Sequence, residues 1–468
     1  MIKDLYIKEI RQYLYSGKII FATVVILSLF IINALMCQRK YDQLNVLYNQ
    51  EKLTNEENIR KSCSSFSDLL FINQQSVKPP SHVAFICDAS ADKLDDAVTI
   101  NAFRLSSLEK LGSDNPYFSS FTAIDWTSII LIVFSFLSIS LCYNAFCGER
   151  AEGTLKLVLS NHVSRWKVFI AKYLGILSVL TIPLLIGILL HLLVIRIGGK
   201  IELDLNDYWL ILLFLVSSVL FISFNVLLYL FISTATSRPV VSLSISLITW
   251  LLLQVVIPQV FWTSSKMMVK IPTFSQVSSE DKIQSESLWK SPSYYGGWNG
   301  DWAGKAPNEN VLKRAALMNA LDASNNQIWG DYTQKLFRQT SFAMNLCKIS
   351  PYSLYGFIGA IISDNGFSGL KNFYTQSENY RESLYKFLIE KDKADPKSYH
   401  LVVNESWSFS SFMSNASLRF EEIPFFEYKS LSAVKALSEL KGDIFIFIFW
   451  NMVLFSVGLV VFMRSDVR

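Results

Sequence analysis

Charged residues are scarce in this sequence of 468 residues. Asp, Glu, Lys and Arg make up 18% of it, whereas hydrophobic residues make up 51%. Soluble domains carry about 25% charged residues, and the deficit here falls in a few long apolar blocks, as it does in membrane proteins. The formal net charge of +4 is too small to indicate a nucleic-acid partner, because the basic residues lie beside the apolar blocks.

Residues for metal, redox or acid–base chemistry are few and scattered. The cysteines form no CxxC pair and no metal-ligand spacing. They are Cys37, Cys63, Cys87, Cys142, Cys147 and Cys347. The sequence leaves open whether Cys63 and Cys87 form a disulfide. The histidines, which lie in different regions, are His82, His162, His191 and His400. We therefore expect no metal site and no catalytic site.

The chain also lacks a phosphate-binding loop, which needs GxxxxGK followed by Ser or Thr. The nearest string runs from Gly300 to Lys305, but its spacing is wrong and Ala306 follows the lysine. We expect that the chain binds no cofactor and is not an enzyme.

Six apolar stretches are each about 18 residues or longer, enough to cross a hydrocarbon layer of about 30 Å as a helix. They cover residues 19–37, 126–146, 168–196, 208–233, 240–262 and 444–463. The first has no small-residue cleavage site after it, so we expect it to remain as a spanning helix. Residues 1–18 carry apolar side chains at helical spacing and four basic residues mostly on the other side, which is typical of an amphipathic helix on a membrane surface.

Lysines and arginines near the ends of these stretches predict the orientation. They gather in residues 1–18, in 147–167 and in the tail 464–468, although Arg39 and Lys40 count against this side. Both termini are therefore predicted in the cytoplasm, which agrees with six crossings. Residues 38–125 and 263–443 then lie outside, with helical patterns at 311–337 and 369–391. The predicted fold class is an all-α polytopic membrane protein with mainly helical extracytoplasmic domains.

The spanning stretches hold almost no ionisable residue. Transporters driven by protons or sodium need acidic or histidine groups near the middle of the membrane. His191 lies near the outer end of the third stretch, where we expect a hydrogen-bonded interface residue. Lys172 lies one turn into the same stretch, so its charge can reach the inner interface. The sequence thus disfavours an ion-driven transporter.

Residues 147–167, between the second and third stretches, have the most distinctive pattern. Glu149 and Glu152 lie near the start, where a helix dipole favours negative charge. Leu155, Leu157 and Leu159 follow as an apolar patch. The pattern predicts a short helix at the membrane surface. It is either a connector with leucines facing lipid or a docking helix that fits a groove of a partner.

This segment resembles the coupling helix of the ABC type-2 permease family, whose pattern is G-E-x-E-x-G-T-L-x-L-L-L-S-x-P-V-x-R. The matching residues are Gly148, Glu149, Glu152, Gly153, Thr154, Leu155, Leu157, Leu159, Ser160, Val163 and Arg165. Ala151 departs from it, and so does His162, which stands where the family has proline and does not fix φ as proline does. Residues 1–18 resemble the elbow helix of the family. Residues 78–81, 349–351 and 464–468 resemble a subgroup that includes permeases of nitrous-oxide-reductase maturation and of bacterial gliding motility.

The resemblance implies a permease that is driven by ATP hydrolysis in partner proteins. Such permeases lie in the bacterial inner membrane, pair with a second copy or a sister permease, and bind two cytosolic ABC ATPase subunits that hold ATP and Mg²⁺. It implies that Arg165 orients the segment or binds lipid phosphate. The residues implied in ATPase coupling are Glu149, Arg150, Glu152, Gly153, Thr154, Leu155, Leu157, Ser160 and Arg165.

Three functions remain open at this point. The first is a permease subunit of an ATP-driven exporter, and the second is a subunit that transports nothing but transmits force to an extracytoplasmic partner. The third and weakest is an enzyme with its site in the outer region, which would need a buried acid–base cluster there. An exporter requires a continuous cavity between two permeases, whereas a force transmitter can keep that interface packed.

Overall fold

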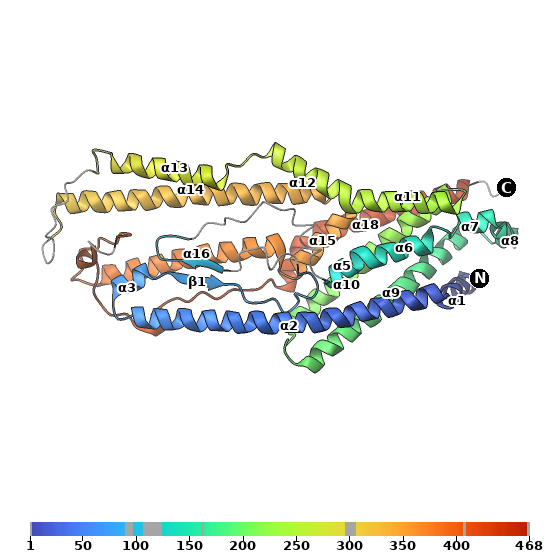
Figure 1. Ribbon diagram of the computed structural model, residues 1–468, viewed down its shortest axis with the longest axis horizontal. Helices are drawn as coiled ribbons and strands as arrows, with labels where there is room; N and C mark the ends of the chain where they lie inside the picture. Colours follow the sequence, from blue (N-terminus) through green and yellow to red (C-terminus); the bar gives the residue numbers. More distant parts are fainter. Residues whose placement is uncertain are drawn as a thin grey trace.

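The computed structural model describes residues 2–88, 97–105, 124–160, 163–294, 306–405 and 409–465. The molecule is elongated, with a bundle of helices at one end and long helices that project from it (Figure 1). Helix α1 (Ile2–Leu14) lies at the same end of the bundle as α7 (Cys147–Ala151) and α8 (Thr154–Ser160) (Figure 1). His162 and most of the tail 464–468 lie outside the described residues.

Within the described residues, six helices are long and apolar enough to cross a membrane, which confirms the predicted number. They are α2 (Gly17–Ser62), the run α5–η2–α6–α7 (Trp126–Ala151), α9 (Arg165–Gly198), α10 (Leu205–Ala235), the run α11–η3–α12 (Pro239–Met268) and α18 (Ala433–Arg464). The amphipathic α1 (Ile2–Leu14) precedes them and packs on α9. The chain is therefore an all-α polytopic membrane protein.

The central helix of the bundle is α10, which packs against α6, α9, α15 and α18. About two thirds of its most apolar window (67%) is buried, against 17% for α11–η3–α12 and 11% for α18. A membrane helix has to be covered by lipid or by protein, since its exposed apolar side chains gain nothing from water. The last two spans therefore present most of their surface to lipid or to a partner subunit.

The projecting region is mainly helical in its described part. The first spanning helix does not stop at the membrane surface, because α2 continues to Ser62 without a break. Beside it lie α3 (Phe66–Phe71), α13 (Phe274–Trp289), α14 (Glu309–Cys347) and α16 (Gly366–Ala394), with short 3₁₀ turns η4 (Ser410–Phe412) and η5 (Phe420–Glu422). Two short strands, β1 (Gln74–Val77) and β2 (Ala97–Ile100), pair antiparallel with Gln74 opposite Ile100. Most of these elements share a hydrophobic core separate from that of the bundle, and Val277 of α13 packs with Tyr332 and Leu336 of α14 in a smaller cluster.

One helix at the junction of the two regions has no counterpart in the sequence prediction. All twelve residues of α15 (Pro351–Ile362) are buried. Tyr355 donates or accepts a hydrogen bond to Ser218 of α10 at 2.7 Å, and Tyr352 does so to Tyr229 at 2.8 Å. Two of the elements that α15 contacts are the π-helical segments η2 (Ile130–Phe134) and η3 (Leu252–Val256), each inside a span. Such π segments interrupt regular helices and often occur at functional positions.

The disulfide left open by the sequence is not formed. Cys63 packs in the core of the projecting region, and Cys87 packs in the core of the bundle. His191 is buried in the bundle, where its Nδ1 lies 3.1 Å from the backbone oxygen of Phe30. This contact matches the prediction of a hydrogen-bonded interface residue.

Candidate functional site: the segment between the second and third spans

Residues 147–160 form two short helices where the sequence predicted one. Helix α7 spans Cys147–Ala151 and α8 spans Thr154–Ser160. Gly153 separates them with φ of 73°, a left-handed conformation that residues with a Cβ rarely adopt. The Thr154 hydroxyl donates to the Glu149 carbonyl at 3.2 Å and holds the turn. The prediction of a single helix was wrong because the glycine ends α7 early and redirects the chain.

A buried ion cluster ties this segment to two other helices. The Lys172 ammonium of α9 lies 2.7 Å from Glu149 Oε1 of α7 and 3.2 Å from Glu9 Oε1 of α1. It also lies 5.6 Å from the centre of the Phe146 ring. The Lys172 side chain is only 3% exposed, so its charge depends on these partners. Glu149 thus points into the protein, and the Lys172 charge is paired with these two carboxylates. Its reach to the inner interface stays a prediction.

Arg150 ties α7 to the end of the central helix. Its guanidinium donates to the backbone oxygens of Thr234 and Thr236 at 3.3 and 3.2 Å. Ser233 Oγ accepts from the backbone N–H of Phe146 at 3.1 Å just before α7. The two Arg150 bonds satisfy carbonyl groups that the end of α10 leaves without helical partners. A displacement of α7 would therefore pull directly on α10.

Arg165 begins α9 and binds the last turn of α18. Its Nη1 donates to the backbone oxygens of Met463 at 2.9 Å and Ser465 at 2.7 Å. A cation at the C-terminal end of a helix meets the negative end of the helix dipole as well as unpaired carbonyls. Of the two predicted roles, orienting the chain has a direct structural basis in these bonds.

The two central leucines of the segment have opposite environments. Leu155 is 0% exposed and belongs to the core of the bundle. Leu157 is 67% exposed. Other exposed residues of the segment are Glu152, Thr154, Lys156 and Ser160. The surface available to a partner is therefore the outer face of α8, and Leu155 anchors that helix to the bundle.

The sequence analysis did not assign Glu9 and Lys172 to this site. The position of Glu9 in the sequence nevertheless indicates that its side chain is buried. Glu9 is four residues after Leu5 and four before Tyr13, so it lies on the apolar face of the amphipathic helix. A carboxylate on that face needs a buried cation. The pairing with Lys172 joins positions 163 residues apart and cannot be read from local spacing.

Comparison with known proteins now identifies the family. The sequence pattern of the ABC-2 family transporter proteins matches residues 4–467, almost the whole chain. The chain belongs to the ABC-2 transporter family. It is therefore a multi-pass membrane protein and a transmembrane permease component of an ABC system, a class whose members associate with ATPase subunits. No individual curated protein matches the chain.

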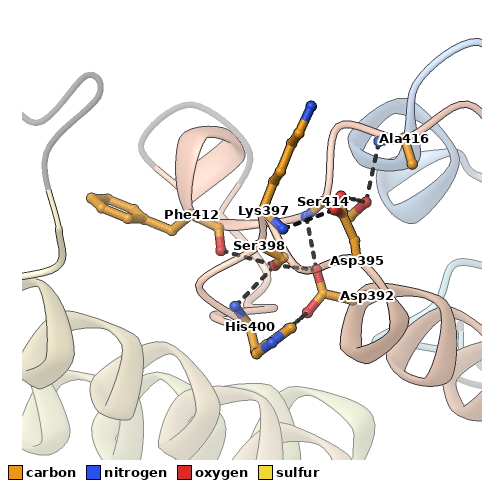
Figure 2. Close-up of polar contacts among 8 residues, drawn as sticks. All are labelled: Asp392, Asp395, Lys397, Ser398, His400, Phe412, Ser414 and Ala416. Carbon is orange, nitrogen blue, oxygen red and sulfur yellow. Dashed lines mark hydrogen bonds and ion pairs between the residues drawn. The ribbon is translucent and has the colours of Figure 1, made fainter.

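This ABC-2 protein also carries an acid–base cluster in its projecting region, shown in Figure 2. The buried Asp392 at the end of α16 accepts hydrogen bonds from Ser398 Oγ at 2.8 Å and from the Ser414 backbone N–H at 2.7 Å. His400 Nδ1 lies 3.1 Å from its other oxygen. Ser414 Oγ donates to Asp395 at 2.6 Å. Both hydroxyls thus donate to aspartates, and within the described residues neither is bonded to the His400 imidazole, which would be the base of a serine nucleophile.

The bonds of the Asp392 cluster join the chain after α16 to the last turn of that helix. His400 has φ of 59°, and its own backbone N–H donates to Ser398 Oγ at 2.9 Å. The arrangement explains how a loop with a left-handed histidine is held. The cluster contains the residue types that the enzyme hypothesis requires, but its described hydrogen bonds do not pair a nucleophile with a histidine base. In the described ranges, no group of three or more possible ligands could hold a metal ion.

Proposed function

We propose that this chain is the permease subunit of an ATP-driven ABC exporter, in which closure of ATPase subunits moves a substrate across or out of the inner membrane. The observation that carries the proposal is the exposed outer face of α8, whose base is bonded to the helices around it. ATP and Mg²⁺ would be held by the partner ATPase. The family membership supports the ABC system itself, and the exporter role and the coupling are our inference.

The contacts explain how force on α8 would spread. The turn at Gly153 connects α8 to α7, where Glu149 bonds Lys172 of α9. Arg150 bonds the end of α10. Buried charge pairs and charged hydrogen bonds are costly to break, so a push at α8 would move these helices together. A lipid-facing connector would need no such bonds to three other helices.

The orientation follows from the same surface. We place the end of the bundle that carries both termini and α8 in the cytoplasm, where ATPase subunits are found. The positive residues near this end support that side. A second permease, either another copy or a sister subunit, would cover part of the apolar surface of α11–η3–α12 and α18. The subgroup that resembles nitrous-oxide-reductase maturation and gliding permeases stays a prediction.

The test is co-purification of an ATPase subunit from native membranes with the chain carrying Leu157→Asp. We expect the ATPase to accompany the wild type and to be lost with the variant, because a carboxylate would sit in a dry protein contact. Leu53→Asp is the matched control, since Leu53 is 65% exposed but lies on the projecting part of α2. Leu155→Asp is unsuitable, because it would place a charge in the core.

Absence of an ATPase with wild-type protein and with both variants would contradict the coupling assignment. Loss of the ATPase with Leu53→Asp as well would show that the effect is not specific to α8. In either case the chain would remain a multi-pass ABC-2 family protein.

A second function, transmission of force to an extracytoplasmic partner, is favoured by one observation. Helix α2 has 46 residues and runs unbroken from the bundle far into the projecting region (Figure 1), about 69 Å at the helical rise. A rigid rod of this length can carry a movement at the membrane to a distant site. Spin labels at Leu53→Cys in paired permeases would change their separation between ATP-bound and nucleotide-free states. A constant separation would contradict this second function.

A further inference from the structure

A cavity of 240 Å³ lies beside α2 where this helix leaves the membrane. One wall of the cavity is a face of α2. On this face, Asn33 and Met36 lie on the bundle side of the Lys40–Asp88 ion pair, which we call below it, and Leu44 and Leu47 lie on the other side, above it. The opposite wall is the chain from Val77 to Asp88. From Asn33 to Leu47 the helix rises about 21 Å. The cavity therefore crosses the membrane boundary.

The boundary level is fixed by polar groups. Lys40 Nζ lies 2.8 Å from Asp88 Oδ2, and the Asp88 backbone N–H donates to Asp125 at 2.9 Å. Asp125 caps the first turn of α5, the start of the second span. Charged side chains of this kind mark the headgroup region. Below them the cavity wall faces the hydrocarbon, and above them it would ordinarily face water.

The wall above the boundary remains apolar where water is expected. Leu44, Leu47 and Pro79 line it, with Glu51 and Lys78 as its charged residues. A second cavity of 290 Å³ shares Tyr48 and Val77 with the first, but most of its other lining residues are polar, so the apolar wall belongs to the first cavity. An apolar cavity open to water is a binding site in most proteins, because leaving it hydrated costs free energy. The site is continuous with a bilayer, which supplies apolar chains at high concentration.

Asn33 adds a second and independent sign of a ligand. Its side chain is 5% exposed and lies on the cavity wall. Its amide N–H donates to the backbone oxygen of Ile124, whereas its Oδ1 is buried and accepts no hydrogen bond within the described residues. A buried acceptor left unsatisfied costs free energy, so a donor on a bound molecule would stabilise it.

We propose that this cavity binds a phospholipid of the leaflet nearest the projecting region, with one acyl chain lodged above the membrane boundary. The headgroup lies at the Lys40–Asp88 level, where the wall carries both charge signs and suits a zwitterionic group such as phosphoethanolamine. The site needs no ATPase, so it stands whether or not the proposed export function is correct.

The test uses the full-length chain in vesicles of phosphatidylethanolamine and phosphatidylglycerol. The probe is phosphatidylethanolamine with a photoreactive diazirine at the end of one acyl chain, and adducts are mapped by mass spectrometry. We expect adducts on residues 44–48 and 77–81, above the boundary. Adducts confined to the exposed faces of α9, α11 and α18 would be those of ordinary surrounding lipid and would overturn the proposal.

Two variants separate cavity binding from surface contact. Leu44→Trp fills the upper cavity and is expected to lose the adducts on residues 77–81 while keeping those on α11. Val46→Trp is the control, because Val46 is exposed on another face of α2. If Leu44→Trp does not fold, Ala84→Leu fills the cavity from the opposite wall. Retained adducts in a folded, filled variant would overturn the proposal, as would native mass spectrometry showing a bound peptide in place of phospholipid.

Discussion

Replacing Lys172 by methionine gives the sharpest test of how the segment between the second and third spans is held. The Lys172 ammonium pairs with two carboxylates, Glu9 of α1 and Glu149 of α7. Methionine keeps the length and the apolar stem of the side chain and removes only the charge. The two carboxylates would then be left in a buried site, where an unpaired charge is costly.

The magnitude follows from burial. Breaking a buried ion pair by removing one partner costs about 3–5 kcal/mol, whereas an exposed pair contributes about 0–1 kcal/mol. The Glu9 and Glu149 side chains are 8% and 20% exposed, so the second can regain part of its hydration. We therefore expect Lys172→Met to lower the free energy of unfolding by about 3 kcal/mol.

The assay is equilibrium unfolding of the purified protein in mixed micelles of detergent and lipid, with Lys8→Met as the control. Lys8 is the exposed neighbour of Glu9 on α1, so its loss should change stability by less than about 0.5 kcal/mol. A triple variant with Glu9→Gln, Lys172→Met and Glu149→Gln should recover much of the loss, because no charge remains buried. If Lys172→Met unfolds like Lys8→Met, the cluster does not hold the segment and the reasoning fails.

Three further predictions concern contacts between other elements of the structure. Gly359→Ala in α15 should cost about 1–3 kcal/mol of unfolding free energy in the same assay, because the new methyl would collide with Thr127 of α5. Arg165→Met should speed amide hydrogen exchange in the last turn of α18, which loses its capping donor; unchanged exchange would contradict that role. The hydrogen bond to the Asp207 carboxylate raises the pKa of His82, so the stabilisation is complete below the unfolded pKa and disappears as pH rises through the folded one. Thermal stability of wild type and His82→Gln should therefore differ at about pH 5.5 and converge by about pH 8.5, and an equal difference at both would refute the assignment.

The membrane frame was predictable because its cause is local. A span needs about 20 apolar residues in a row, and each stretch can be judged without knowing what it contacts. The structure extends the predicted stretches by a few residues at most ends, as with 168–196 against Arg165–Gly198. Pro183 does not interrupt α9, since a single missing N–H can be tolerated inside a long membrane helix.

Helix α15 was missed for the opposite reason. The twelve mostly apolar residues of Pro351–Ile362 are too few for a span and fall inside a region predicted to be extracytoplasmic. Burial of such a segment depends on which helices surround it, and α15 contacts four of the spans as well as α16. The same limit applies to Lys172, whose two partners come from α1 and α7. Pairings over long separations are not encoded in local periodicity.

The break at Gly153 could have been found from the sequence. A glycine two residues after α7 and before a new apolar run is a common helix terminator. The family pattern runs through Gly153 without a break, so the prediction of a single helix overlooked this turn. The turn decides which leucine is available to a partner, since it directs Leu157 outward and Leu155 toward the core.

The position of α15 bears on the choice between export and force transmission. Besides its two tyrosine bonds to α10, its N-cap Ser350 bonds the backbone of Leu253 in η3, and Gly359 packs closely on Thr127 of α5. The chain then enters α16 of the projecting region within four residues of the end of α15. A rotation of any of these spans would therefore reach α16 through a helix that has no free face to absorb it. Export could proceed along the dimer interface with α15 fixed in place, whereas force transmission requires α15 to move with the spans. The relative movement of α15 and α16 during the ATP cycle is thus the quantity that separates the two functions.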